Sequence, residues 1–139
     1  MKSLNTYLYE SRSHVARIFV IIKPGFLKYS QDIVERFLDD GWEIEKQRTK
    51  RLTLSEAKKL YYIHKDKDFY KDLCKYMSSD ITIAFIFKKD NAKQSEDIFK
   101  QTSLIKDELR KEYGESDMRN VLHSSDSPQH MIQEQPIYF

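Results

Sequence analysis

Apolar runs separated by polar segments predict the order of strands and helices along the chain. The five apolar residues at 18–22, and the segment 81–87 in which only Thr82 is polar, are typical of strands that are buried on both faces. Alternating positions at 42–50 predict a half-exposed strand. The short apolar piece at 121–123 predicts a fourth, brief strand.

Helical spacing of apolar residues fills the intervals between these strands. Residues 30–40 form one such helix, with Ser30 as its predicted cap and Gly41 as the residue that ends it. Thr53 and Glu56 have the spacing of a capping box. This box opens a pair of helices that are broken by the polar residues 65–68.

The second half of the chain adds further helices. Two are predicted at 91–100 and 105–113, separated near Thr102, and Ser127 followed by Pro128 starts a last short helix. The resulting order is βαββαβ with extra helices. It predicts an α+β fold, a ferredoxin-like sandwich with a four-stranded antiparallel sheet and helices on its faces.

The two ends of the chain differ in pattern. Residues 1–15 show no clean period and predict a loosely ordered extension, so the domain is expected to span 16–139. The tail Ile137-Tyr138-Phe139 is apolar, and we expect it to dock on the body of the protein.

Composition narrows the class of protein. A chain of 139 residues is the size of one domain. Because 24 Lys and Arg face 22 Asp and Glu, the net charge is only +2, which argues against a protein that coats nucleic acid. The lone Cys74 excludes an internal disulfide and a cysteine-based zinc site.

The sequence also carries no membrane or export signal. No apolar run approaches the roughly 20 residues that span a bilayer, and residues 1–16 lack the apolar region of a signal peptide. We therefore expect a soluble, cytoplasmic protein without a membrane partner.

One of the four histidines stands in a chemically suggestive place. His14, His64 and His130 have no partner at the spacing of a helical zinc site. His123 lies at the predicted strand end, just before a hydroxyl-rich segment and a helix start, where phosphate groups bind favourably. An imidazole with an ordinary pKa of about 6.5 is also a competent nucleophile near neutral pH. Lys23, at the Pro24-Gly25 turn, is a candidate partner for an anion.

Two segments that contain these residues resemble one family. Residues 19–25, Phe-Val-Ile-Ile-Lys-Pro-Gly, resemble the opening strand of the nucleoside diphosphate kinases, and residues 119–127, Arg-Asn-Val-Leu-His-Ser-Ser-Asp-Ser, resemble their phosphohistidine motif. Residues 66–70 and 75–77 fit in order between them. The likeness runs from about residue 16 to the end.

The resemblance implies an enzyme that moves the γ-phosphoryl of a nucleoside triphosphate to a nucleoside diphosphate, by a ping-pong mechanism through phosphohistidine at His123. It implies that Glu134 orients the imidazole and that Ser125 lies beside it. It also implies that Lys23 and Tyr61 contact the transferring phosphoryl.

The resemblance further implies nucleotide contacts and partners. Asn120 with Lys23 would contact the ribose, Phe69 would stack on the base, and Arg110 and Thr102 would bind the β-phosphate. Mg²⁺ would arrive with the nucleotide, within reach of Asp126 through water. Nucleoside di- and triphosphates are the implied ligands, and the implied assembly is a homo-oligomer.

Departures from the family pattern leave a second hypothesis open. Gly25-Phe26 replaces the family's Asp-Gly, and Ser124 replaces a glycine. The segment before Arg110 is about four residues shorter than in the family. It also lacks a second phosphate-binding arginine, for which Lys93 or Lys100 offers a partial substitute. The alternative is a nucleotide-binding regulatory or scaffold protein with weak or no turnover. A nucleic-acid binder that uses the basic run 46–51 is disfavoured, because the aromatic pairs of an RNA-binding sheet are absent.

Overall fold

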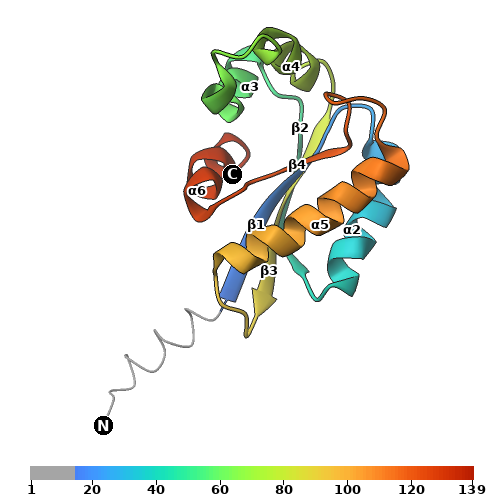
Figure 1. The fold of residues 1–139 in the computed structure, drawn as a ribbon, viewed down its shortest axis with the longest axis vertical. Helices are drawn as coiled ribbons and strands as arrows, with labels where there is room; N and C mark the ends of the chain where they lie inside the picture. The colour runs from blue at the N-terminus through green and yellow to red at the C-terminus, as the bar shows by residue number, and fades with distance from the viewer. Residues whose placement is uncertain (1–14) are drawn as a thin grey trace.

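A four-stranded antiparallel sheet forms the centre of the structure, a computed structural model that describes residues 15–139 (Figure 1). The predicted extension therefore lies outside the described residues, except for Val15, and so does His14. The strands are β1 (Val15–Ile22), β2 (Glu43–Lys50), β3 (Thr82–Asp90) and β4 (Leu122–Ser124), in the order β2-β3-β1-β4. Neighbouring strands pair antiparallel throughout this sheet, as the sequence predicts.

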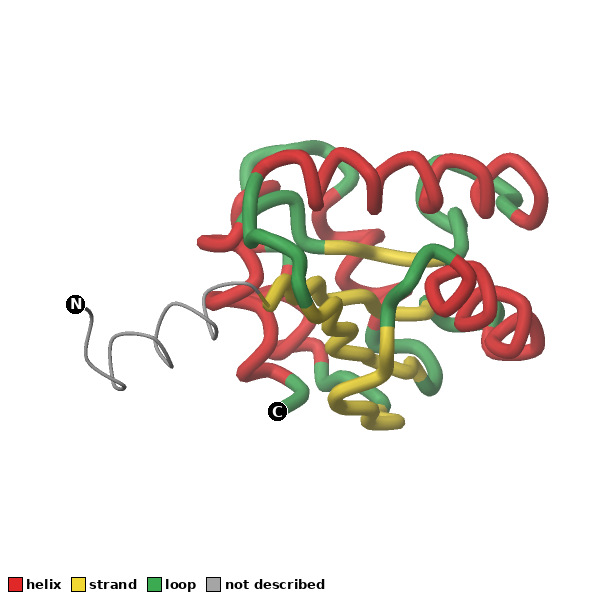
Figure 2. The backbone as a smooth tube through the Cα atoms, turned by 90° about the horizontal axis from the view of Figure 1, so that it is seen from below, coloured by secondary structure: helices red, strands yellow, loops and turns green. Residues whose placement is uncertain are grey.

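Helices cover both faces of the sheet (Figure 2). Within the described residues they are α2 (Ser30–Asp39), α3 (Leu54–Leu60), α4 (Tyr70–Met77), α5 (Glu96–Tyr113) and α6 (Pro128–Glu134), with 3-10 turns at Leu27–Tyr29, Tyr62–His64 and Gln135–Ile137. Apolar side chains of α2 and α5 pack on one face, and those of α3, α4 and α6 pack on the other. This arrangement is the predicted ferredoxin-like sandwich.

Strand β1 carries the centre of both apolar layers. Ile18, Val20 and Ile22 point to the layer with α2 and α5, whereas Phe19 and Ile21 point to the layer with α3, α4 and α6. All five side chains are at most 1% exposed. Alternate residues of a strand face opposite sides, so the continuous apolar run is explained by burial on both faces.

Three local predictions need correction. The two helices expected at 91–100 and 105–113 are one helix, α5, which begins at Glu96 rather than at residue 91 and runs through Thr102 without a break. The Thr102 hydroxyl donates to the Ile98 carbonyl at 2.9 Å, so its polar group is satisfied within the helix. Ser30 is not a cap: the 3-10 turn runs directly into α2, and Tyr29 occupies the cap position. Strand β2 is exposed along nearly its whole length rather than half-exposed, and Trp42 before it supplies the buried side chain.

The predicted helix starts at Thr53 and Ser127 are confirmed. The Thr53 hydroxyl accepts from the Glu56 N–H at 3.1 Å, and the Glu56 carboxylate accepts from the Thr53 N–H at 3.0 Å. The Ser127 hydroxyl accepts from the His130 N–H at 3.2 Å, with Pro128 in the first turn.

The chain end docks on the sheet, as its apolar character predicts. Tyr138 is 1% exposed, and its hydroxyl lies 2.5 Å from the Thr82 hydroxyl. Lys50 Nζ donates to the Ile137 carbonyl at 2.9 Å, and Arg48 Nη1 donates to the Tyr138 carbonyl at 3.1 Å. Two cations of the basic run 46–51 are thus engaged by the protein itself, which further disfavours the nucleic-acid hypothesis.

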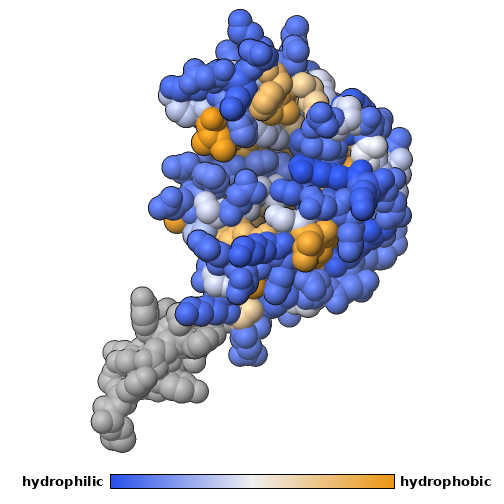
Figure 3. Space-filling model, in the orientation of Figure 1, coloured by the Kyte–Doolittle hydropathy of each residue, from blue (hydrophilic) through white to orange (hydrophobic). Residues whose placement is uncertain are grey.

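The surface agrees with the charge-rich composition. The face drawn in Figure 3 is mostly hydrophilic, with separate hydrophobic patches. Among residues 15–139, every helix is too short or too polar to cross a membrane.

Candidate active site

A cavity of about 550 Å³ lies beside the end of β4, between α5, α6 and the connection from α3 to α4. Eight residues that the sequence nominates line it: Lys23, Tyr61, Phe69, Arg110, Asn120, His123, Asp126 and Glu134. These residues come from distant parts of the chain, and the fold brings them together around one hollow.

His123 and Glu134 form a hydrogen-bonded pair at the base of this cavity. His123 Nε2 lies 2.7 Å from Glu134 Oε1, and Ser125 Oγ donates to Glu134 Oε2 at 2.6 Å. Because an ionised carboxylate can only accept, the shared hydrogen belongs to Nε2. Nδ1 therefore keeps its lone pair, which is the state of a nucleophilic imidazole.

The charge state of Glu134 follows from its surroundings. Burial alone would raise the pKa of this carboxyl, but the hydrogen bonds from His123 and Ser125 outweigh burial and hold the pKa below its ordinary value. Glu134 is therefore ionised at neutral pH and accepts both hydrogen bonds as a carboxylate.

The backbone before His123 is fixed in an unusual conformation. Val121 has a φ of 83°, in the left-handed region that β-branched residues rarely adopt. Its carbonyl accepts the Lys23 N–H at 2.9 Å, and β4 pairs with β1 so that His123 stands opposite Ile21. Strain of this kind persists only where the surroundings hold it and is typical of functional sites.

Lys23 is a buried cation that is partly bound by the protein. Its side chain is 4% exposed, and Nζ donates to Asn120 Oδ1 at 2.6 Å and to the Met118 carbonyl at 3.3 Å. Burial, followed by repulsion from Arg110 and Lys106, lowers the pKa of Lys23 to about 7. A negatively charged ligand in the cavity would reverse this effect.

Arg110 projects from α5 and fixes the segment before β4. Nε donates to the Asn120 carbonyl at 3.2 Å, and Nη2 donates to the Leu122 carbonyl at 3.0 Å. Burial lowers the pKa of this guanidinium, which stays charged. Arg110 thus positions the His123 segment and faces the cavity at the same time.

Two aromatic rings occupy different depths of the cavity. Tyr61 is 5% exposed, and its ring meets the His123 ring edge-on with centroids 5.3 Å apart. Its hydroxyl has no hydrogen-bond partner within residues 15–139, and burial raises its pKa well above the ordinary value. Phe69 lies at the mouth, 46% exposed, with its ring 5.6 Å from that of His64.

Two predicted site residues do not line the cavity: Ser125, which is buried and donates to Glu134, and Thr102. Thr102 is 1% exposed and bonds to its own helix. The proposed substitutes Lys93 and Lys100 are both exposed and lie outside the lining as well.

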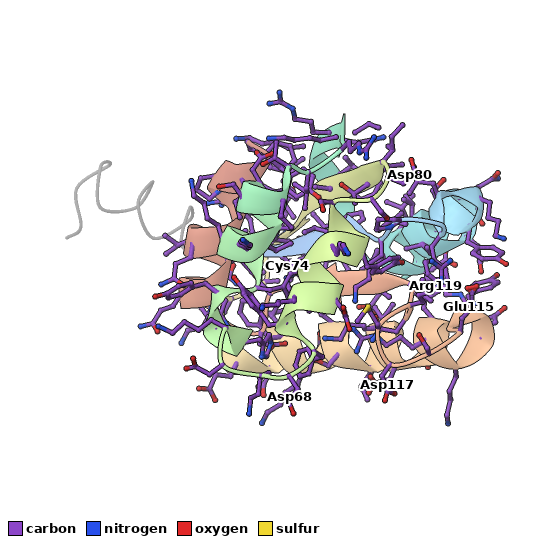
Figure 4. All side chains as sticks on the ribbon, turned by 90° about the horizontal axis from the view of Figure 1, so that it is seen from above. Asp68, Cys74, Asp80, Glu115, Asp117 and Arg119 are labelled. Atoms are coloured by element: carbon purple, nitrogen blue, oxygen red, sulfur yellow. The ribbon has the colours of Figure 1, made fainter. Side chains whose placement is uncertain are left out.

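Among the lining residues that sequence reasoning missed, Lys106 and Asp117 are the Lys and Asp side chains. Lys106 stands one turn before Arg110 on α5, a spacing that becomes informative once the helix is recognised as continuous. Asp117 precedes β4, and Figure 4 shows it at the same end of the molecule as Asp68. No local signal in the sequence marks Asp117, since its place depends on the path of the whole connection.

An ion pair also links two residues of the connection between α5 and β4. Arg119 Nε lies 3.2 Å from Glu115 Oε2, and Figure 4 shows the two side chains next to each other. The Arg119 guanidinium also lies over the rings of Phe26 and Tyr76, 5.7 and 5.3 Å from their centroids. These contacts tie the segment that carries Asp117 and Met118 to the turn after β1.

The sheet and its covering helices define a ferredoxin-like fold. Its cavity is lined by a histidine and several cations. The family model described as "Nucleoside diphosphate kinase" matches residues 16–139. A nucleoside diphosphate kinase of Kosmotoga olearia is 32% identical over 129 residues, with 88% of each chain covered. That of Geotalea daltonii is 33% identical over 129 residues, with 88% of this chain and 94% of its own covered.

A solved structure gives the same result. The nucleoside diphosphate kinase of Aquifex aeolicus, in an orthorhombic crystal form, matches with a TM-score of 0.79 at 26% identity and covers 90% of this chain and 95% of its own. The chain belongs to the nucleoside diphosphate kinase family.

Proposed function

We propose that this protein is an active nucleoside diphosphate kinase that transfers a phosphoryl group by way of His123. The observation that carries the proposal is the pair of hydrogen bonds on Glu134, from His123 Nε2 at 2.7 Å and from Ser125 Oγ at 2.6 Å. This arrangement holds Nε2–H in place and leaves Nδ1 to react. No separate base is needed, because the nucleophilic nitrogen carries no proton to remove.

The proposed reaction has two balanced halves. The Nδ1 lone pair of His123 forms a bond to the γ-phosphorus, the bond from that phosphorus to the β,γ-bridging oxygen breaks, and the nucleoside diphosphate leaves with the electron pair. A second diphosphate then attacks phosphohistidine through a terminal phosphate oxygen, and the electron pair of the broken N–P bond returns to Nδ1. During the first half, the positive charge that grows on the ring is balanced by Glu134.

Tyr61 and Lys23 supply the remaining contacts of the transferring group in this proposal. The unpaired Tyr61 hydroxyl lies on the ring that touches His123, so a phosphoryl oxygen would satisfy it. Lys23 would become fully charged when the phosphates enter. Fixed donors of this kind stabilise the charge that spreads over the equatorial oxygens.

The nucleotide itself would extend from the phosphates to the mouth of the cavity. Asn120 and Lys23 would meet the ribose, Arg110 the β-phosphate, and Phe69 the base, on which its exposed ring can stack. Stacking reads no base edge and tolerates several bases. Nucleoside di- and triphosphates are thus the proposed substrates.

The donor set fits an ion that arrives on the nucleotide. Within residues 15–139 there is no cluster of three or more ligating side chains, and the carboxylate of Asp126 lines the cavity with its side chain 67% exposed. Mg²⁺ commonly takes one or two carboxylates, substrate phosphates and several waters. When bound, it would neutralise phosphate charge, with Asp126 as its contact through water.

A homo-oligomer remains part of the proposal. Strand β2 is an edge strand. Its residue Ile44 is 41% exposed, and Leu38 of the neighbouring helix α2 is 43% exposed. An exposed edge with apolar neighbours favours pairing with another chain. Light scattering of the purified protein would test it, since a monomeric mass would contradict the proposal.

The decisive experiment is phosphorylation by γ-labelled ATP alone. We expect an acid-labile, alkali-stable label on the protein that a second nucleoside diphosphate removes as triphosphate. His123→Ala should abolish the label, whereas the control His130→Ala, another histidine that lines the cavity, should keep it. Nucleotide binding without any label would favour the alternative of a regulatory or scaffold protein.

A further inference from the structure

We propose that Lys106 is a phosphate-binding residue of this cavity, and that it exchanges its contact with Asp126 for a nucleotide phosphate when the nucleotide enters. The proposal rests on the proposed function, because it takes the phosphates of a nucleoside diphosphate as the ligand. Its evidence is the hydrogen bonding of three cations that line the cavity, Lys23, Lys106 and Arg110.

Two of these cations are already engaged by the protein. Lys23 Nζ donates to Asn120 Oδ1 at 2.6 Å and to the Met118 carbonyl at 3.3 Å. Arg110 donates through Nε and Nη2 to two backbone carbonyls, at 3.2 and 3.0 Å. Lys23 is thus left with one N–H for a ligand, and the orientation of the Arg110 guanidinium is fixed by its two backbone bonds.

Lys106 has its three donors free. Within the described residues its ammonium donates no hydrogen bond, and the closest acid, Asp126 Oδ1, lies at 3.8 Å. That distance is too long for a hydrogen bond. Because the Asp126 side chain is 67% exposed, water screens the attraction between the two charges.

The ammonium is nevertheless withdrawn from solvent. The Lys106 side chain is only 12% exposed, and burial, followed by repulsion from Arg110, lowers its pKa. A cation that is buried without hydrogen bonds is unfavourable. An anion that enters the cavity would relieve this cost, and the negative charge of a diphosphate matches the charge of the three cations.

The helix fixes the spacing of the two cations that it carries. Lys106 and Arg110 are four residues apart on α5, so they lie on one face and about 6 Å apart along the axis. Both line the cavity. A polyphosphate chain that contacts Arg110 through one phosphate can therefore reach Lys106 through the next.

The competing explanation is that Lys106 and Asp126 form an ion pair that serves stability alone. The two explanations differ in the sign of their effects. A structural pair predicts that removal of either charge lowers stability and leaves phosphate affinity unchanged. The phosphate-binding role predicts that loss of the Lys106 charge leaves stability unchanged or raises it, and that it weakens binding of a phosphate-bearing ligand.

Calorimetric titration without Mg²⁺ separates these outcomes, with ADP and adenosine as the two ligands. Lys106→Met keeps most of the side-chain volume and removes the charge. We expect it to weaken ADP binding about 10- to 100-fold, to leave adenosine binding unchanged and to reduce the salt dependence of ADP binding. Lys106→Arg should restore most of the affinity, whereas Lys111→Met, at an exposed site on the same helix, should have no effect.

Asp126→Asn completes the design. It should tighten ADP binding, because it removes the carboxylate that competes for the Lys106 ammonium. Equal ADP affinity in wild type and Lys106→Met, measured on folded protein, would overturn the proposal, and Lys106→Gln repeats the measurement if the methionine variant does not fold. Failure of the proposed function would look different: ATP would leave no label on wild-type His123, while ADP binding would still depend on Lys106.

Discussion

Replacement of Glu134 by glutamine tests whether the charge of this residue, rather than its shape, prepares His123. An amide oxygen can still accept from His123 Nε2–H, and the amide nitrogen can donate to Ser125 Oγ, which lies 2.6 Å from the present carboxylate oxygen. Glu134→Gln therefore keeps two hydrogen bonds and removes one negative charge. The side chains of His123 and Glu134 are only 17% and 11% exposed. Solvent therefore does little to compensate for the lost charge.

The expected magnitude follows from the change in bond type. A hydrogen bond to a charged group contributes about 1.5–3 kcal/mol and a neutral one about 0.5–1.5 kcal/mol. The loss is therefore about 1–1.5 kcal/mol of transition-state stabilisation, which corresponds to a phosphorylation rate about 5- to 13-fold lower. Glu134→Ala should cost more, because it also frees the orientation of the imidazole.

Rapid-mixing measurement of the phosphohistidine burst with ATP gives this rate directly. Thermal unfolding of both variants serves as the control for folding, and Ser125→Ala serves as a matched variant that removes one bond but keeps the charge. A burst rate for Glu134→Gln equal to that of wild type would refute the reasoning, since the carboxylate charge would then play no part in the transfer.

Three other expectations follow from the structure. Tyr61→Phe should raise the free energy of unfolding by about 1 kcal/mol in urea titrations, because it removes a buried hydroxyl that has no partner in residues 15–139. The same variant should phosphorylate more slowly. A lower free energy of unfolding would contradict this view. Burial lowers the pKa of Lys23 to about 7, so at pH 8 the free side chain is mostly neutral and an entering phosphate restores its charge. Calorimetry in buffers of different ionisation enthalpy should then show proton uptake of up to one at pH 8 and almost none at pH 6, and Lys23→Met should abolish it. Thr53→Ala should destabilise the protein by about 1 kcal/mol through loss of the capping box, whereas Ser55→Ala in the same turn should change it little.

The parts of the fold that local chemistry determines were accessible from the sequence. The strand at 18–22 is apolar at every position because both faces of β1 are covered, and the capping box at Thr53 is a local motif with a local cause. The candidate site residues near His123 were predicted through the resemblance to a family motif, which depends on the arrangement of the whole site rather than on local propensity.

The errors have a common physical origin in tertiary context. Thr102 interrupts the apolar pattern and suggested a break, yet its hydroxyl is satisfied within the helix and its side chain is covered. The same continuous helix turns Lys106 toward the cavity and leaves Lys100 outside it, whereas Lys93 precedes the helix and also lies outside the lining. Which lysine faces a cavity depends on helix phase, and a predicted break between the two halves of α5 removes the phase.

Continuity of α5 also limits how the length of this segment can vary. Irregular connections usually tolerate inserted residues. A helix does not: one additional residue between Lys106 and Arg110 would turn the second side chain by about 100° relative to the first, away from the carbonyls of Asn120 and Leu122 that it now contacts. The number of residues from Ile98 to Arg110 is therefore fixed by the helix. We expect viable length variants of this protein to place their insertions before α5, in residues 91–95.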